Sequence, residues 1–575
     1  MSSQAKPDPD DESFFCQLCS TIKFSRSDFR EDNAGATTPS SPWTEPTHTQ
    51  SHITPQAASL LRSPTKRQVH AQSTTISTSS MDELLNHSVE WPNHPDLFPP
   101  LAATATPMHV HAPHLLPAPP KPHHHAAALR FTVAASAAAP SATTRKAVIV
   151  GGGLAGLAAA THLTSLSVPF TLVEASDRLG GRVATDVVDG YRLDRGFQIF
   201  LTAYPECRRL LDFPALRLRP FYPGALVFSG AGDGEKPSFH LLSDPFRLPL
   251  RSISAAFSPI GTLSDKVLVG LTRLRAAATP DNVILSSPET TTARHLEQLG
   301  FSPSIVERFL RPFLAGIFFD PALDTSSRLF ELVFKRLALG DNALPEDGIG
   351  AIASQLAERL PAGSVRLNSR AAAIDPYSGV TLDTGEIISG DLGVIVAVEQ
   401  PEAEKLLPQL SNREKPNKKS AERSTVCLYF SADWALVEDP ILLLNGSGKG
   451  IVNNMFFATN VAPSYAPAGK VLVSVSLVGS FADREDADLA EEVVRELGGW
   501  FGAGEVASWR HLRTYRIGFA QPDQTPPTAP AGRDPRVGDG VYVCGDHWCS
   551  ATFDGALVSG RRAAEALAKD RGLSS

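Results

Sequence analysis

The hydrophobic positions of this chain change from scattered to periodic at residue 146. Before that point Ser, Thr, Pro, His and Ala dominate, and no period of 2 or 3.6 residues persists. Such a segment buries too little apolar surface to offset the entropy lost when it orders. We therefore expect residues 1–145 not to fold, and the globular part to run from Lys146 to about Lys569.

The first periodic segment predicts a strand, a glycine-rich turn, a helix and a second strand. Residues 147–150 are all apolar, and residues 170–173 form a second strand-like run. Between them, apolar residues recur at near-helical spacing at Leu157, Ala160, Leu163 and Leu166. This order of elements is a βαβ unit.

The later segments predict further helices and strands in a mixed order. Residues 201–339 look mainly helical, residues 348–360 form an amphipathic helix, and Asp383-Thr384-Gly385 marks a hairpin. Apolar runs predict strands at residues 364–367, 394–398, 425–430, 471–478 and 540–544, and a last helix spans residues 555–568. The segment between residues 413 and 423 is charged and predicts an exposed loop.

Composition narrows the class of protein. At 575 residues the chain is too long for one core, so two or more domains are expected. A net charge of -8 with no basic stripe argues against nucleic acid as a partner. No apolar run reaches the roughly 18–20 residues of a membrane span, although peripheral membrane contact stays open. Six scattered cysteines predict neither a disulfide framework nor a metal site.

An acid-free stretch sets off one part of the N-terminal segment. No Asp or Glu occurs from Leu97 to Val173, and from Met108 the chain is rich in Ala, Ser and Thr with scattered Arg and Lys. This composition is typical of an organellar transit peptide, most like a plastid one. We therefore predict a chloroplast location, with residues 108–145 as transit peptide and residues 1–107 as a disordered or gene-model extension. A tail without any address is the alternative.

The turn after the first strand carries a nucleotide-binding pattern. Gly151, Gly153 and Gly156 form G-x-G-x-x-G: the first permits the tight turn, the second lets backbone approach a pyrophosphate, and the third lets the helix pack closely. The helix that begins near Leu154 and Ala155 would present free amides to the phosphates. Glu174, 18 residues after Gly156, is placed to accept hydrogen bonds from a ribose. The segment predicts a dinucleotide site.

Two further motifs point to a family. ASDRLGGRVAT follows Glu174, and GVYVCGDHWCSATFDGALVSGRRAA lies near the C-terminus. Together with the first turn, and in the same order, they resemble the flavin-dependent amine oxidase superfamily. That superfamily includes monoamine and polyamine oxidases, protoporphyrinogen oxidase, and carotenoid desaturases and isomerases.

The resemblance implies a cofactor, FAD, and roles for particular residues. The first glycine turn would hold the pyrophosphate, and Glu174 would bind the adenosine ribose. Arg182 would lie beside the phosphates and flavin, and Gly545-Asp546 near the ribityl chain. The helix at Ala556 and Leu557 would point its N-terminus at the flavin. The remaining contacts would come from Ala371 near the adenine and from Gly196 and Phe197 near the isoalloxazine.

The implied fold is α/β, with a discontinuous Rossmann-like FAD/NAD(P)-binding domain and an inserted α+β substrate domain. Three blocks of sequence would build the FAD-binding domain, and two blocks between them the substrate domain. The former are residues 146–230, 340–400 and 538–570, and the latter are residues 231–339 and 401–537.

The implied activity is that of an FAD-dependent oxidoreductase. No counterpart of the amine oxidases' active-site lysine or aromatic pair can be placed, which favours the carotenoid-desaturase and protoporphyrinogen-oxidase branch. We expect hydride transfer from a C–H bond of an apolar or amphipathic, isoprenoid- or tetrapyrrole-like molecule to flavin N5. An amine oxidase, or a flavoprotein isomerase or scaffold without net redox turnover, is the alternative. No general base can be named; weak candidates are His547, Trp548, Arg195 and Tyr204.

Overall fold

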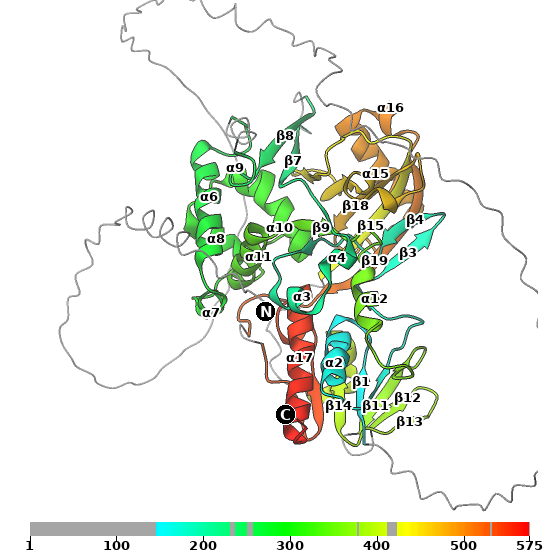
Figure 1. The fold of residues 1–575 in the computed structure, drawn as a ribbon. Helices are drawn as coiled ribbons and strands as arrows, with labels where there is room; N and C mark the ends of the chain where they lie inside the picture. The colour runs from blue at the N-terminus through cyan, green and yellow to red at the C-terminus, as the bar shows by residue number, and fades with distance from the viewer. Residues whose placement is uncertain are drawn as a thin grey trace, which may run out of the picture. The chain divides into compact units, whose positions relative to one another are not determined.

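The computed structural model describes residues 145–230, 236–249, 257–375, 379–410, 423–529 and 532–573 (Figure 1). The predictions for residues 1–107, and for residues 108–145 apart from Arg145, lie outside these ranges. So does most of the charged segment before residue 423, whereas Arg423 itself begins a buried strand.

A six-stranded sheet forms the nucleotide-binding part. Its order is β10-β2-β1-β14-β21-β20; the first five strands pair in parallel and β20 is an antiparallel edge. Every residue of β1, β2 and β14 is buried, as expected for a sheet covered on both faces. The strands are β1 (Ala147–Val150), β2 (Phe170–Val173), β10 (Val365–Arg366), β14 (Gly393–Val396), β20 (Arg536–Gly538) and β21 (Val541–Val543). The Rossmann-like prediction is confirmed.

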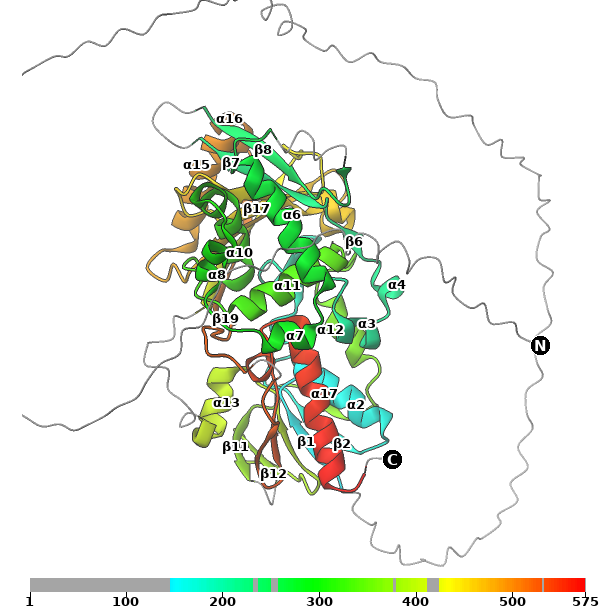
Figure 2. The same cartoon turned by 90° about the vertical axis from the view of Figure 1, so that its left-hand side faces the viewer.

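Two helices cover one face of this sheet, and a small antiparallel sheet covers the other. Helix α2 (Leu154–Ser165) and helix α17 (Phe553–Asp570) lie side by side in both views (Figures 1 and 2). The two helices approach so closely that a Cβ at Gly560 would lie 2.0 Å from the Ala155 carbonyl oxygen. Only glycine fits at this position. The opposite face carries β11 (Ala371–Asp375), β12 (Gly379–Leu382), β13 (Ile387–Ile388) and α13 (Gln400–Leu406).

A seven-stranded sheet forms the second part, in the order β19-β15-β18-β17-β16-β7-β8. Its pairs are antiparallel except β16 with β7, and all ten residues of β15 are buried. The strands are β7 (Gly224–Ser229), β8 (Ser238–Ser243), β15 (Arg423–Ala432), β16 (Leu442–Asn445), β17 (Asn454–Phe457), β18 (Val471–Val478) and β19 (Arg510–Gln521). One face packs on α15 (Asp486–Phe501) and α16 (Ala503–Val506).

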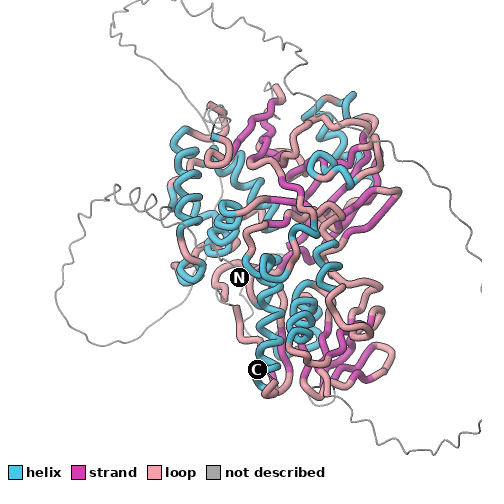
Figure 3. The backbone as a smooth tube through the Cα atoms, in the orientation of Figure 1, coloured by secondary structure: helices cyan, strands magenta, loops and turns pink. Residues whose placement is uncertain are grey.

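Helices between residues 263 and 339 lie on the other side of the seven-stranded sheet from α15 (Figure 3). Helix α6 begins with a capping box in which Thr262 and Asp265 satisfy each other's backbone amides. These helices are α6 (Leu263–Ala278), α7 (Asp281–Ser286), α8 (Thr292–Leu299), α9 (Pro303–Ile305), η1 (Val306–Leu310), α10 (Arg311–Phe318) and α11 (Ser327–Leu339). None of the described helices is long and apolar enough to cross a membrane.

The mainly helical prediction for residues 201–339 was incomplete. Strands β7 and β8 form a hairpin within it, and β7 pairs with β16, more than two hundred residues later. Short apolar runs do not distinguish strand from helix, and here distant pairing decides. The division into domains stays a prediction, but β7, which we assigned to the FAD-binding block 146–230, hydrogen-bonds within the seven-stranded sheet.

Short elements connect the two large sheets. The β3–β4 hairpin follows the second glycine motif, and α12 precedes β10 where the amphipathic helix was predicted. The short elements are β3 (Thr185–Val188), β4 (Tyr191–Asp194), β5 (Phe200–Leu201), α3 (Pro205–Leu210), α4 (Phe213–Leu216), β6 (Arg219–Pro220), β9 (Asn342–Leu344), α12 (Ala351–Ala357), η2 (Pro408–Leu410), α14 (Ala458–Val461), η3 (Pro463–Tyr465) and η4 (Asp546–Trp548).

Candidate functional site

The first glycine turn is too tight to accept side chains at two of its positions. Gly151 has φ +102°, and a Cβ there would lie 2.8 Å from the Ala397 carbonyl oxygen. A Cβ at Gly156 would come within 1.9 Å of the Gly151 carbonyl oxygen. The glycines therefore let β1, the turn and α2 pack against β14, as the sequence pattern predicted.

The N-terminus of α2 is open. Its N-cap is Gly153, no described side chain accepts a hydrogen bond from its first amides, and its first turn contains no acid. A Cβ at Gly153 would meet no described atom within 4 Å. The free amides and partial positive charge of α2, including those of Leu154 and Ala155, thus face open space. This arrangement fits the pyrophosphate of a dinucleotide such as FAD.

Glu174 lies at the end of β2, where its carboxylate is tied to the glycine turn. Oε2 accepts a hydrogen bond from the Gly152 amide at 2.7 Å, and Oε1 accepts from the Ser176 amide at 2.9 Å. Oε1 also accepts from the Ser176 hydroxyl at 2.8 Å, so Oε2 is the oxygen that keeps acceptor capacity for a ligand hydroxyl. Ala371 begins β11 and packs on the apolar cluster that contains Val173. Ala371 and Glu174 therefore both lie near the carboxyl ends of β1 and β2.

The second glycine motif packs directly on the first. Gly180 forms a bridge with Gly153, and its amide donates to the Gly152 carbonyl at 2.8 Å. Gly180 and Gly181 both have positive φ, +112° and +58°, which a side chain would strain. This turn places Arg182 near the carboxyl ends of the parallel strands, where α2 begins.

Arg182 joins the N-terminal motifs to the C-terminal motif. Its Nη2 lies 2.7 Å from Oδ2 of Asp546, 364 positions later, and its Nη1 donates to the Ala520 carbonyl at 2.7 Å. Burial would raise the pKa of Asp546, but the charge of Arg182 and the neighbouring His547 outweigh it, so the pKa is lowered. Gly545-Asp546 follows β21, which lies beside β14 and one strand from β1. The two distant glycine bends therefore converge at one edge of the sheet.

His547 has a buried side chain whose ring nitrogens form no hydrogen bond in the described part of the chain. The side chain is 5% exposed, and Nδ1 lies 3.8 Å from Oδ1 of Asp546. A Cβ at Gly545 would lie 2.5 Å from this ring, which explains the glycine. Buried polar groups almost always have partners, so the orphaned ring fits a site that takes a polar ligand such as FAD.

Helix α17 begins two residues earlier than predicted, at Phe553. The Thr552 hydroxyl accepts from the Gly555 amide at 2.9 Å, and the Thr552 carbonyl accepts from the Ala556 amide at 3.0 Å. Leu557 is fully buried in a core cluster that also contains Leu154. The amides of Gly555 and Ala556 at this N-terminus therefore have partners within the protein, and the roles of Ala556 and Leu557 stay predictions.

Gly196 and Phe197 lie between the Arg182 turn and the seven-stranded sheet. The Gln198 side chain donates to the Arg182 carbonyl at 2.8 Å, which ties the segment to the turn. Phe197 packs on Phe456 with ring centroids 4.5 Å apart, and Phe221 completes the cluster. The segment therefore connects the Arg182 turn to an apolar aromatic cluster, and its role beside the flavin stays a prediction.

The remaining weak candidates have structural partners. Trp548 donates through its indole nitrogen to the Asp534 carbonyl at 2.9 Å. Tyr204 is buried in the core cluster beside α2, and burial raises the pKa of its hydroxyl above the ordinary value. Arg195 forms a two-nitrogen ion pair with Asp186.

Sequence reasoning missed one buried acid, Asp194. It accepts hydrogen bonds from the Thr185 hydroxyl at 2.6 Å, the Ile349 amide at 2.9 Å and the Tyr465 hydroxyl at 3.0 Å. Burial raises the pKa of Asp194 to about 6. The only sequence signal was an acid at the end of an apolar strand next to Gly196, which also occurs at ordinary turns.

Comparison with known proteins gives one family. The sequence matches the family described as flavin containing amine oxidoreductase over residues 154–568. A 15-cis-phytoene desaturase, chloroplastic/chromoplastic, of an Oncidium hybrid cultivar is 24% identical over 453 residues, 73% of this chain and 77% of that protein. Protoporphyrinogen oxidase 2, chloroplastic/mitochondrial, of Arabidopsis thaliana is 24% identical over 208 residues, 36% of this chain and 38% of the relative.

Solved structures share the fold. A crystal structure from Exiguobacterium sp. 255-15, provisionally named a protoporphyrinogen oxidase, superimposes with a TM-score of 0.57. The two sequences are 20% identical, and the match covers 74% of this chain and 99% of that chain. At this identity the likeness concerns the arrangement of the sheets and helices.

Proposed function

The chain belongs to the family of flavin containing amine oxidoreductases and is an FAD-dependent oxidoreductase; from this premise we propose that it takes hydride from a C–H bond of an apolar or amphipathic small molecule. An isoprenoid such as a carotene, or a reduced tetrapyrrole, is the substrate class we propose. Relatives named for phytoene desaturation and protoporphyrinogen oxidation support it. Bound FAD would supply the hydride acceptor, its N5.

One observation carries the choice of an apolar substrate over an amine. Phe197 and Phe456 are in direct contact, 4.5 Å between centroids and tilted by 39°, so no amine group fits between their rings. Lys335, the one buried lysine of the described ranges, is bound to Asp281 at 2.8 Å and to the Thr279 carbonyl at 2.6 Å. Within the described ranges, neither this ring pair nor the buried lysine is therefore free to act as in an amine oxidase.

The residues at the site would act by holding and orienting. The open end of α2 would hold the pyrophosphate, and Arg182 with Asp546 would fix the cofactor's middle. Phe197 is partly exposed and packs on the buried Phe221 and Phe456, so it would offer the apolar surface of this cluster. Hydride transfer would depend mainly on holding the C–H bond about 3–3.5 Å from its acceptor. The cation left on the substrate would then lose a proton from the neighbouring C–H or N–H to form the double bond, and no residue is assigned as the base that accepts this proton.

Anaerobic spectroscopy tests this function. Purified holoprotein should show oxidised flavin absorbance, and mixing with 15-cis-phytoene or protoporphyrinogen in detergent should bleach it in a single turnover. Putrescine serves as the amine control. Bleaching by putrescine alone would overturn the proposal, and product isomerisation without bleaching would favour a flavoprotein isomerase.

A plastid location is also proposed. The acid-free segment from Met108 and the chloroplastic names of relatives support it. A fluorescent fusion of the chain from Met108 to Lys146 should enter chloroplasts. Diffuse cytosolic fluorescence would contradict the transit-peptide interpretation.

Contact with a lipid surface follows from an apolar substrate, which partitions into membranes. One face of α6 exposes Leu263, Val267 and Leu271 by 64%, 56% and 55%, at helical spacing of four residues. The arginines of the same helix are bound within the protein, Arg273 by Asp244 and Arg275 by Glu331, so the apolar face itself would make the contact. Replacing the three apolar residues by Gln should abolish sedimentation with anionic vesicles. Ile387→Gln, at another exposed apolar site, is the control.

A further inference from the structure

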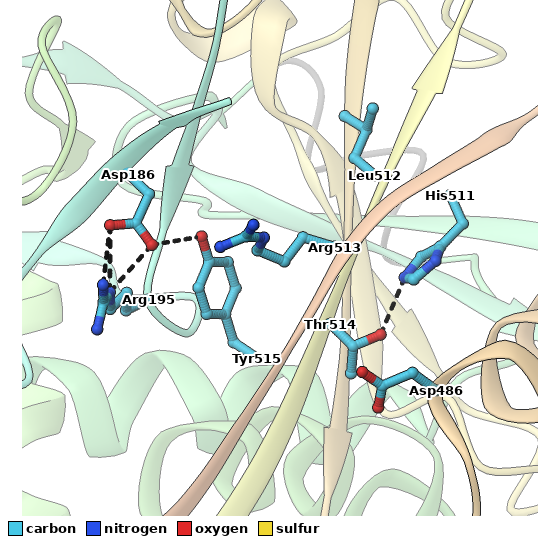
Figure 4. A pocket seen from close by; sticks show the side chains of 8 residues that line it. All are labelled: Asp186, Arg195, Asp486, His511, Leu512, Arg513, Thr514 and Tyr515. Atoms are coloured by element: carbon cyan, nitrogen blue, oxygen red, sulfur yellow. Dashed lines mark hydrogen bonds and ion pairs between the residues drawn. The ribbon is translucent and has the colours of Figure 1, made fainter. Parts of the chain in front are cut away.

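A polar cavity of about 450 Å³ lies apart from the flavin residues, where edge strand β19 faces the β3–β4 hairpin (Figure 4). Five of its lining residues, from His511 to Tyr515, are consecutive on β19, and Asp186 and Arg195 come from the hairpin region. The cavity therefore joins the chain that follows Arg182 to the edge of the seven-stranded sheet.

A β-bulge shapes the β19 side of the cavity. Tyr429 pairs with Arg513 and Phe430 pairs with His511, so Leu512 is an extra residue on β19. The bulge turns His511 to the same face as Thr514, where its Nε2 lies 2.9 Å from the threonine hydroxyl. Arg513 and Tyr515 share the other face, toward the hairpin. Bulges often re-aim side chains at binding sites.

Asp186, the acid on the hairpin side, accepts hydrogen bonds from two arginines and a tyrosine. Asp186 accepts from Arg195 Nε at 3.0 Å, from Arg178 Nη1 at 3.3 Å and from the Tyr515 hydroxyl at 2.8 Å. Burial would raise the pKa of Asp186, but these hydrogen bonds and charges outweigh it and lower the pKa. One carboxylate thus balances two guanidinium groups, and the local charge stays positive.

Arg513 adds a further cation. It is exposed and forms no ion pair with any residue that the structure describes; its guanidinium lies 6.0 Å from the Tyr515 ring centroid. Figure 4 shows its side chain directed to the Tyr515 side of β19. The other acid that lines the cavity, Asp486, is engaged by Arg516 at 2.8 Å. Arg513 therefore lacks the counter-charge that each neighbouring arginine has.

We propose that this cavity binds an oxyanion, a carboxylate or phosphate group of a small molecule, between Arg513 and Arg195. Arg195 uses Nε and Nη2 on Asp186 and keeps Nη1 for a ligand. Asp186 holds Arg195 and Tyr515 in position beforehand, which reduces the entropy lost on binding. The Thr514 hydroxyl and His511 offer polar contacts to the rest of the ligand across the strand edge. None of the residues that line the cavity is among those assigned to the flavin, although Arg195 directly precedes Gly196.

Ligand titration of the flavin-loaded protein tests the site. Thermal unfolding and calorimetry are followed with inorganic phosphate and, separately, with sodium acetate, each at constant ionic strength set by NaCl. Arg513→Gln removes the unpaired cation. Arg510→Gln is the matched control, because Arg510 is on the same strand but outside the cavity and pairs with Asp189.

At least one of the two anions should raise the unfolding temperature of the wild-type protein and of Arg510→Gln. Arg513→Gln should bind that anion about tenfold more weakly or worse, since hydrogen bonds to a charged group are the strong ones. Which anion binds identifies the ligand group. Absence of binding by the wild-type protein, or equal binding by Arg513→Gln, would overturn the proposal. Flavin absorbance per protein confirms that all three proteins are equally loaded.

Discussion

Arg182 and Asp546 form the ion pair on which the convergence of the motifs depends. Asp546 is 11% exposed and Arg182 32% exposed, with 2.7 Å between Nη2 and Oδ2. Removing one partner of such a pair leaves a largely buried charge without compensation, which is far more costly than losing an exposed pair.

Arg182→Met should therefore lower the free energy of unfolding by about 3 kcal/mol, the lower end for a broken buried pair because Arg182 is partly exposed. It should also reduce the flavin retained through purification. Chemical denaturation and the ratio of flavin to protein absorbance measure both effects. Arg366→Met, which breaks the exposed pair with Glu386, is the control and should cost much less, because water screens that pair. Equal losses in the two variants would contradict the assignment.

Asp194 makes the stability of the protein depend on pH. Its pKa rises from 3.8 to about 6 on folding because of burial, so between about pH 4 and 6 the folded state holds more protons than the unfolded state. Stability is therefore highest below this window, falls as the pH rises through it, and stays lower above it. The loss attributable to Asp194 is on the order of 3 kcal/mol.

Asp194→Asn should remove this pH dependence while keeping acceptors for Thr185 and the Ile349 amide. Urea unfolding from pH 4 to 8 should show the wild-type free energy falling relative to that of the variant across the window, then running parallel. If the two curves run parallel throughout, the carboxyl titrates at its ordinary pKa and the prediction is wrong.

At the scale of elements, Gly153 and Gly156, at the start of α2, lie in opposite environments. A Cβ at Gly153 meets no described atom within 4 Å, whereas a Cβ at Gly156 would come within 1.9 Å of the Gly151 carbonyl oxygen. The two glycines separate the role of the turn in binding from its role in packing.

Gly153→Ala should leave the unfolding free energy of the flavin-free protein nearly unchanged and weaken flavin binding about tenfold or more, because its methyl group enters the space for the pyrophosphate. Gly156→Ala should destabilise the flavin-free protein by about 1–3 kcal/mol through overpacking. Flavin titration and denaturation of both variants measure these effects. Unchanged flavin affinity in Gly153→Ala would place the pyrophosphate elsewhere.

Strand β7 is an element that the local sequence did not predict. Its residues, Gly224–Ser229, contain a short apolar run that fits a buried strand or part of a helix. Only pairing with β16 and with β8 makes it a strand. By contrast, β18 was predicted with its observed bounds because eight consecutive residues are strand-forming and need no partner to be recognised.

At the scale of the molecule, the chain divides by its contacts into residues 1–130 and residues 131–575. Every hydrogen bond described above for the flavin residues joins partners within the second unit, such as Glu174 with Gly152 and Arg182 with Asp546. Because the composition of residues 1–145 predicts a segment that does not fold, the chain without residues 1–130 should retain the same flavin content and the same rate of flavin bleaching as the full chain. A fall of more than about twofold in flavin affinity, roughly 0.4 kcal/mol, would show that the first unit contributes to the site.

The sequence alone was sufficient for the βαβ unit, the glycine turn and the nature of the cofactor. In that segment, turn geometry and hydrophobic period depend on residues within about thirty positions of one another, and three motifs in order identify the family. Only the tertiary structure brought Arg182 to Asp546, placed Asp194 among three donors from different segments, and left Arg513 without a counter-charge among the described residues. Those features depend on which distant strands pair and what they bury, and nothing local in the chain encodes that choice.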